Sequence, residues 1–153
     1  MRYRLVWVNW SGFMLVIAVD PGEKRLGIAI SDPTGTIANP LVVLAHVSRP
    51  IDAASIAQLA VERGAGLIVI GQALDEENHP TPQARRAARL AGAVKSQTSI
   101  PVVLWDESGS TQAARHARIA LGTSQRRRSG HMDDLAATVI LQSYLDARAA
   151  TER

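Results

Sequence analysis

Three short apolar runs, rich in β-branched residues and separated only by tight turns, most constrain how this chain can fold. The first two, residues 15–20 and 26–31, flank the turn PGEKR, and a second turn precedes the third run at 37–44. Connections this short cannot carry a strand back across a sheet, so the runs predict an antiparallel meander. Pro40 inside the third run indicates an edge strand or a bulge.

After the meander, the pattern changes to alternating helical and strand-like segments. Helical spacing of apolar residues covers 52–63, 111–121 and 132–148, and Thr81-Pro82 looks like the start of a helix that runs to Lys95. Short apolar strands lie between these helices, at 67–71 and 101–107, and a loop covers 122–131. The order β-β-β-α-β-α-β-α-α predicts an α/β fold with a mixed five-stranded sheet and helices on both faces.

The length and composition suit one compact domain. The chain has 153 residues, of which 46% are hydrophobic and 20% charged, as in ordinary globular proteins. The absence of cysteine excludes disulfides and thiolate metal sites and fits a cytoplasmic protein. No apolar run approaches the ~20 residues of a membrane span. We expect a domain at 14–148, a tail at 149–153, and at 1–13 either an N-terminal extension or an extra edge strand.

Acidic residues lie where elements begin or end. Asp20 closes the first strand, Asp106 and Glu107 close the fifth, and Asp133 and Asp134 begin the last helix. Each acid has an ordinary structural explanation, as a turn residue or as a partner of the helix dipole. Active sites in alternating sheets, however, gather at the carboxyl ends of strands. The conjunction of three acidic positions therefore predicts one acidic site at that edge.

Three crowded carboxylates must take up protons or bind a cation. Oxygen ligands favour Mg²⁺ or Mn²⁺, and such ions can activate water for phosphodiester cleavage. Between Thr111 and Gly130 the chain has no acid and five arginines, namely Arg115, Arg118, Arg126, Arg127 and Arg128. This tract indicates a polyanionic partner or, equally, a solvated loop.

Several ordered motifs give the chain a family resemblance that spans residues 14 to about 146. The segment DPGEKRLGIA begins at Asp20, IANPL follows at 37–41, and the middle strand ends in Ile70-Gly71. DESGST then covers 106–111, and Asp133 precedes AATVILQSYLD. In this order the motifs resemble the YqgF/RuvX family, which has an RNase H-like fold and is related to Holliday-junction resolvases.

The resemblance implies a hydrolase, a nuclease that processes the 5′ end of pre-16S rRNA, with nucleic acid as its partner, no membrane, and Mg²⁺ or Mn²⁺ as cofactor. It implies that Asp20, Glu107 and Asp133 are catalytic metal ligands, with Asp106 and Asp134 as additional acids. Lys24 and Arg25 match the family's basic pair after the first turn. We expect this pair to bind the phosphate backbone together with the arginines at 126–128.

The chain departs from the family pattern at a few positions. Ser108 replaces the family arginine of the second acidic motif, Gly109 follows it, and Glu23 replaces a threonine beside the first acid. Serine cannot replace the bidentate fork of arginine. We expect the rRNA nuclease to be a monomer or a homodimer. Two alternatives stay open beside it: a dimeric resolvase of branched DNA, and a nucleic-acid-binding module with weakened catalysis.

Overall fold

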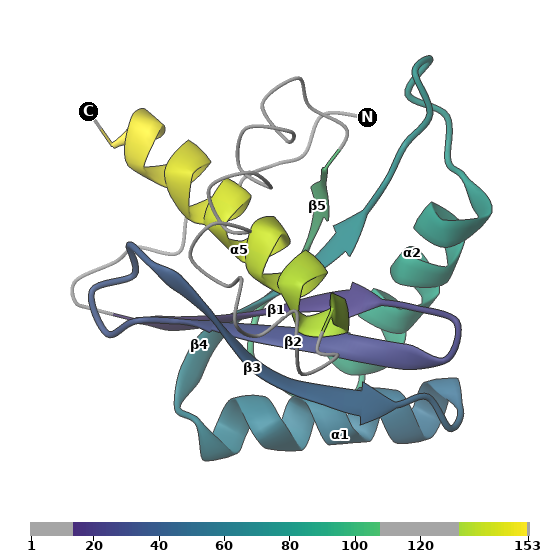
Figure 1. The fold of residues 1–153 in the computed structure, drawn as a ribbon. Helices are drawn as coiled ribbons and strands as arrows, with labels where there is room; N and C mark the ends of the chain where they lie inside the picture. The colour runs from purple at the N-terminus through teal and green to yellow at the C-terminus, as the bar shows by residue number, and fades with distance from the viewer. Residues whose placement is uncertain (1–13, 108–131, 153) are drawn as a thin grey trace.

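The chain folds around a mixed five-stranded sheet (Figure 1). The computed structural model describes residues 14–107 and 132–152. The strand order across the sheet is β3-β2-β1-β4-β5. The strands are β1 (Leu15–Pro21), β2 (Arg25–Ser31), β3 (Ala38–Ala45), β4 (Ala65–Gln72) and β5 (Val102–Asp106).

The predicted meander is confirmed. Strand β2 pairs antiparallel with both β1 and β3, whereas β4 runs parallel to β1 and β5 runs parallel to β4. Strand β3 lies at the edge, and its register shifts where Ile28 pairs with Val42 but Ala29 pairs with Pro40. Pro40 therefore marks both an edge strand and a bulge. The carboxyl ends of β1, β3, β4 and β5 share one edge of the sheet, because these four strands run in the same direction.

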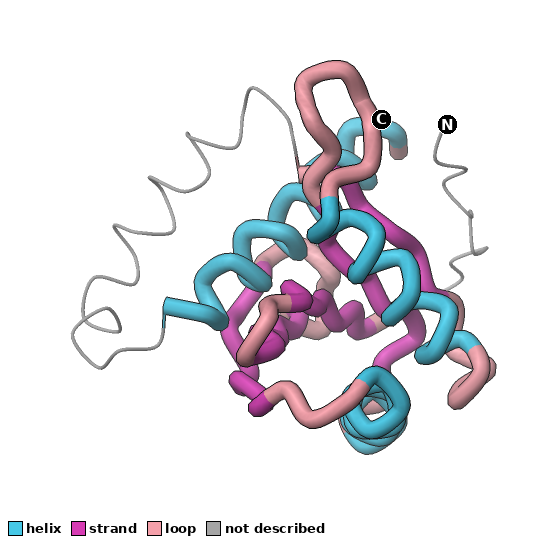
Figure 2. The backbone as a smooth tube through the Cα atoms, turned by 90° about the vertical axis from the view of Figure 1, so that its right-hand side faces the viewer, coloured by secondary structure: helices cyan, strands magenta, loops and turns pink. Residues whose placement is uncertain are grey.

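Helices cover both faces of the sheet, as predicted, and the strands lie between them (Figure 2). Helices α1 (Arg49–Glu62) and α2 (Pro82–Lys95) pack on one face, and α5 (Met132–Thr151) packs on the other. The alternation of strand side chains creates these two cores. In β1, Ile17 and Val19 face α1 and α2, while Val16 and Ala18 face α5.

The helix boundaries differ from the sequence prediction at two ends. Helix α1 begins at Arg49 rather than at residue 52, because Ser48 caps it: the Ser48 hydroxyl accepts a hydrogen bond from the Ile51 N–H at 3.4 Å. Helix α5 continues to Thr151, into the segment expected to be a tail. Helix α2 begins after its Thr81 cap, as predicted.

Some predictions fall on residues that the structure does not describe. These are the segment 1–13, the helix at 111–121 and the loop at 122–131. Within the described ranges, none of the helices combines the length and the hydropathy required to cross a bilayer.

Candidate active site

Strand alternation brings Asp20 and Glu107 to the same face of the sheet. Val16 and Ala18 belong to the core beneath α5, so Asp20, at the next position of the same period, also faces α5. On β5, Trp105 packs against that same core, and Glu107 follows two residues later. Two acids that are far apart along the chain therefore meet at one edge and on one face.

Both acids line a pocket of about 260 Å³ at the carboxyl edge of the sheet. Its walls also include Gln72 and Gln83 from the β4–α2 region, and Ala136 and Ile140 from α5. Glu107 is only 8% exposed. Its backbone N–H donates to the Gln72 carbonyl at 3.0 Å, which extends the β4–β5 pairing by one residue. The pocket therefore holds an acid whose backbone is fixed by the sheet.

Helix α5 lies close to the sheet beside this pocket. The indole N–H of Trp105 donates to the Ser143 hydroxyl at 2.9 Å, and the Trp105 ring meets Tyr144 edge to face, with ring centres 5.4 Å apart. Gly71 permits the close approach: a Cβ at this position would lie 2.3 Å from Cδ1 of Ile140. The position of α5 thus depends on the absence of a side chain at residue 71.

The β1–β2 hairpin places two basic side chains directly after Asp20. The Gly22 N–H donates to the Arg25 carbonyl at 2.9 Å, and a Cβ on Gly22 would lie 2.4 Å from that same oxygen. The turn therefore requires glycine. Lys24 and Arg25 are exposed on the hairpin. Glu23 does not line the acidic pocket; its carboxylate lies 3.5 Å from Nη1 of Arg86 on α2.

Asp106 has a different role from its neighbour Glu107. It does not line the pocket, and its Oδ1 accepts a hydrogen bond from the Leu74 N–H at 3.4 Å. Leu74 lies near the start of the long loop that leads from β4 to α2 and projects beyond the sheet (Figures 1 and 2). Asp106 therefore helps to fix the base of this loop.

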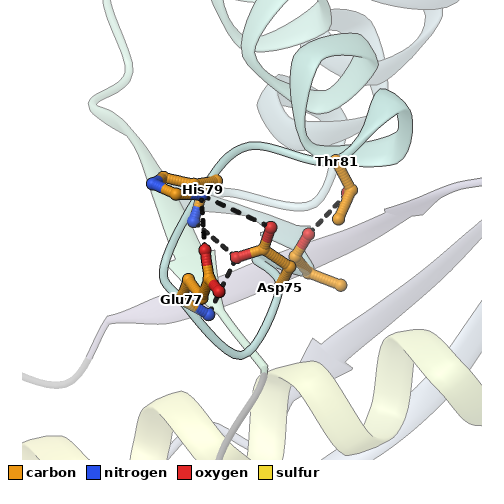
Figure 3. A network of polar contacts seen from close by, with 5 residues as sticks. Asp75, Glu77, His79 and Thr81 are labelled. Carbon is orange, nitrogen blue, oxygen red and sulfur yellow. Dashed lines mark hydrogen bonds and ion pairs between the residues drawn. The ribbon is translucent and has the colours of Figure 1, made fainter.

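The tip of the loop is held by its own polar contacts (Figure 3). Asp75 accepts hydrogen bonds from the N–H groups of Glu77 and His79, at 2.9 and 2.7 Å. The Thr81 hydroxyl donates to the Ala73 carbonyl at 2.6 Å and ties the two ends of the loop together. These contacts shape the loop beside the pocket.

Gln83 is a pocket residue that sequence reasoning missed. Its side-chain oxygen accepts from the Ala73 N–H at 2.8 Å, and its amide nitrogen donates to the Gly71 carbonyl at 3.4 Å. Gln83 thus joins the end of β4 to α2. No sequence signal marks it, beyond its place just after the predicted Thr81-Pro82 helix start.

The remaining predicted site residues lie outside the described side chains. Asp133 and Asp134 belong to the first turn of α5, but their side chains are not described, and neither are Ser108, Gly109 and the arginines at 126–128. Among the side chains that are described, no three histidines or acids are grouped closely enough to hold a metal ion.

Comparison with known proteins gives consistent results. A family model described as RuvX, Holliday junction resolvase, matches residues 14–147. A curated relative from Pelotomaculum thermopropionicum is 37% identical over 142 residues, 92% of both chains, and one from Geobacillus kaustophilus is 37% identical over 137 residues, 88% of this chain and 99% of the relative. Both are named as candidate pre-16S rRNA nucleases.

The fold is also similar to that of solved structures. Thermus thermophilus RuvC superposes with a TM-score of 0.60 at 16% identity, covering 90% of this chain and 98% of RuvC. RuvC in complex with a Holliday junction gives a TM-score of 0.59 at 17% identity, covering 90% of this chain and 97% of that one. This likeness confirms the expected RNase H-like fold.

Proposed function

Because the chain belongs to the RuvX family, we propose that it is a metal-dependent endonuclease that hydrolyses phosphodiester bonds in structured nucleic acid. The names of its relatives favour precursor 16S rRNA as the substrate, cut near its 5′ end in the cytoplasm. The observation that carries this proposal is the shared pocket of Asp20 and the buried Glu107.

The donor set of this pocket fits Mg²⁺ or Mn²⁺. Asp20 and Glu107 offer carboxylate oxygens, which are the hard ligands that these ions prefer. A carboxylate as buried as that of Glu107 is costly unless a cation or hydrogen bonds offset its charge. A bound cation would supply an activated water and stabilise the charge on the leaving oxygen.

Helix geometry supports Asp133 as the third ligand. Position 133 lies three and seven residues before Ala136 and Ile140, which line the pocket, and this spacing puts all three positions on one helix face. Position 134 lies two and six residues before the same pocket-lining positions, and these spacings put it on a different helix face. Asp133 is therefore the better candidate of the two acids.

The other residues of the site would bind and orient the substrate. Lys24 and Arg25, exposed on the hairpin directly after Asp20, would contact phosphates near the scissile bond. Gln83 and the contacts of α5 with the sheet would hold the acids in place.

The test is cleavage of a precursor 16S rRNA fragment by variants that keep the fold. Asp20→Asn and Glu107→Gln should each lower the rate by about a hundredfold or more, a loss of the size seen when one electrostatic contact is removed from an active site. Glu62→Gln, which changes an exposed acid at the end of α1, is the matched control and should cleave normally. Full activity in Asp20→Asn would refute the assignment.

Substrate preference, oligomeric state and RNA binding separate the alternatives. The family description favours a branched-DNA resolvase as the second candidate, and such an enzyme would prefer four-way junctions and act as a dimer, because it cuts two strands symmetrically. A weakened binding module would bind RNA without metal-dependent cleavage. Mn²⁺ titration of the wild type and of Asp20→Asn provides a readout that does not depend on turnover.

A further inference from the structure

A second pocket, of about 390 Å³, lies on the other side of the β1–β2 hairpin from the candidate active site. Its walls come from the hairpin, from the first turn of α1 and from one face of α2. Three arginines line it: Arg49 is the first residue of α1, and Arg86 and Arg89 are three residues apart on α2. We call this cavity the arginine pocket.

The acids of the arginine pocket do not neutralise its three guanidinium groups. Asp52 is only 4% exposed, accepts a hydrogen bond from the Val47 N–H at 3.0 Å, and pairs with Nδ1 of His46. Glu23 is the remaining acid, and its side chain is 80% exposed and only 3.5 Å from Nη1 of Arg86. The pocket therefore carries a net positive charge.

Two further features favour an anion in this pocket. Ser48 and Pro82, which line it, stand at the beginnings of α1 and α2, where the helix dipoles favour negative charge. The Arg86 side chain is 40% exposed, so its guanidinium stays accessible to an anion in the pocket.

We propose that the arginine pocket binds a backbone phosphate of the substrate, next to the phosphate that is cut. Asp20 lines the active-site pocket and Gly22 lines the arginine pocket. The hairpin turn thus separates the two pockets, and a nucleic-acid strand that crosses this turn would carry phosphates past both. This inference rests on the proposed function and assigns it a substrate subsite.

Binding of a fluorescein-labelled single-stranded RNA, followed by anisotropy in EDTA, tests the subsite without cleavage. Arg89→Gln should weaken binding about tenfold and lower the slope of log K against log salt by about 0.7, as expected for one lost phosphate contact. Arg86→Gln should act in the same direction. Glu23→Gln should strengthen binding, because it removes the acid that opposes the phosphate.

Arg63→Gln is the matched control. Arg63 caps the other end of α1, about 20 Å from Arg49 at 1.5 Å per residue, and its substitution should change the affinity much less. Arg89 is exposed, so its variant should fold even if Arg86→Gln does not. An unchanged affinity and salt slope in both Arg89→Gln and Glu23→Gln would overturn the inference.

Two more measurements separate this inference from the proposed function. Asp20→Asn should lose cleavage but keep RNA binding and its sensitivity to Arg89→Gln, so failure of cleavage leaves the subsite test intact. Inorganic phosphate at millimolar concentration should not displace the RNA. Displacement by phosphate at that concentration would show that the pocket serves a free anion and would also overturn the inference.

Discussion

Gly71→Ala should disturb the contact between α5 and the sheet beside the acidic pocket. The new methyl carbon would lie 2.3 Å from Cδ1 of Ile140 and 2.9 Å from its Cγ1. Carbon atoms in contact are normally ~3.5–4.0 Å apart, so the gap must open by more than 1 Å. The β-branched Ile140 has few other rotamers on a helix, so part of this movement must come from α5 itself.

The expected cost is about 1–3 kcal/mol of unfolding free energy, the usual range for an added methyl group in a packed core. Ile140→Val removes Cδ1 and alone should cost about 0.5–1.5 kcal/mol. Together the two changes nearly conserve volume, so the double variant should be more stable than the sum of the two costs predicts, by about 1 kcal/mol. This coupling is the specific signature of the contact.

Urea denaturation measures these free energies, provided that the m-value stays constant. In melting experiments, 1 kcal/mol should correspond to about 2–4 °C for a domain of this size. Gly92→Ala is the control: a Cβ at this position on α2 meets no atom within 4 Å, so helix propensity should stabilise this variant by about 0.5–1 kcal/mol. Additivity of Gly71→Ala and Ile140→Val would refute the reasoning.

Two further predictions concern the turn after β2 and the start of α1. Hydrogen bonds from the Thr34 hydroxyl and the Ile37 N–H lower the pKa of Asp32 from 3.8 to about 2. A lowered pKa stabilises the fold above pH 3.8, and this contribution is lost as the pH falls toward 2. Asp32→Asn should therefore lower the urea midpoint at pH 7 but not at pH 2. An equally lowered midpoint at both pH values would contradict this prediction. Ser48→Ala removes the hydroxyl that accepts a hydrogen bond from the Ile51 N–H and should lower the free energy of unfolding by about 1 kcal/mol. Ser48→Gly should lower it by only a few tenths of a kcal/mol. Equal losses in the two variants would argue against capping.

The sequence predicted the fold well because its local patterns agree with the tertiary structure. Continuous apolar runs rich in β-branched residues marked the strands, and the ends of these strands indicated the shared edge of Asp20 and Glu107; that the two acids also share a face is seen only in the structure. The start of α1 was placed three residues late, because apolar spacing begins only at residue 53 and Ser48-Arg49-Pro50 was not read as a capped helix start.

The arginine pocket could not be predicted from the sequence. Its basic residues come from two helices whose N-terminal turns meet only after folding, and Arg49, Arg86 and Arg89 form no charge run along the chain. The contact of Glu23 with Arg86 could not be predicted from the sequence either. The sequence placed it beside Asp20, but the hairpin turns its carboxylate toward Arg86 and away from the acidic pocket.

The edge position of β3 affects how the protein behaves at high concentration. An open strand edge invites pairing with another chain and, eventually, aggregation. Pro40 lacks an N–H group, and the bulge beside it bends the strand. This border of the sheet is therefore a poor template for a foreign strand.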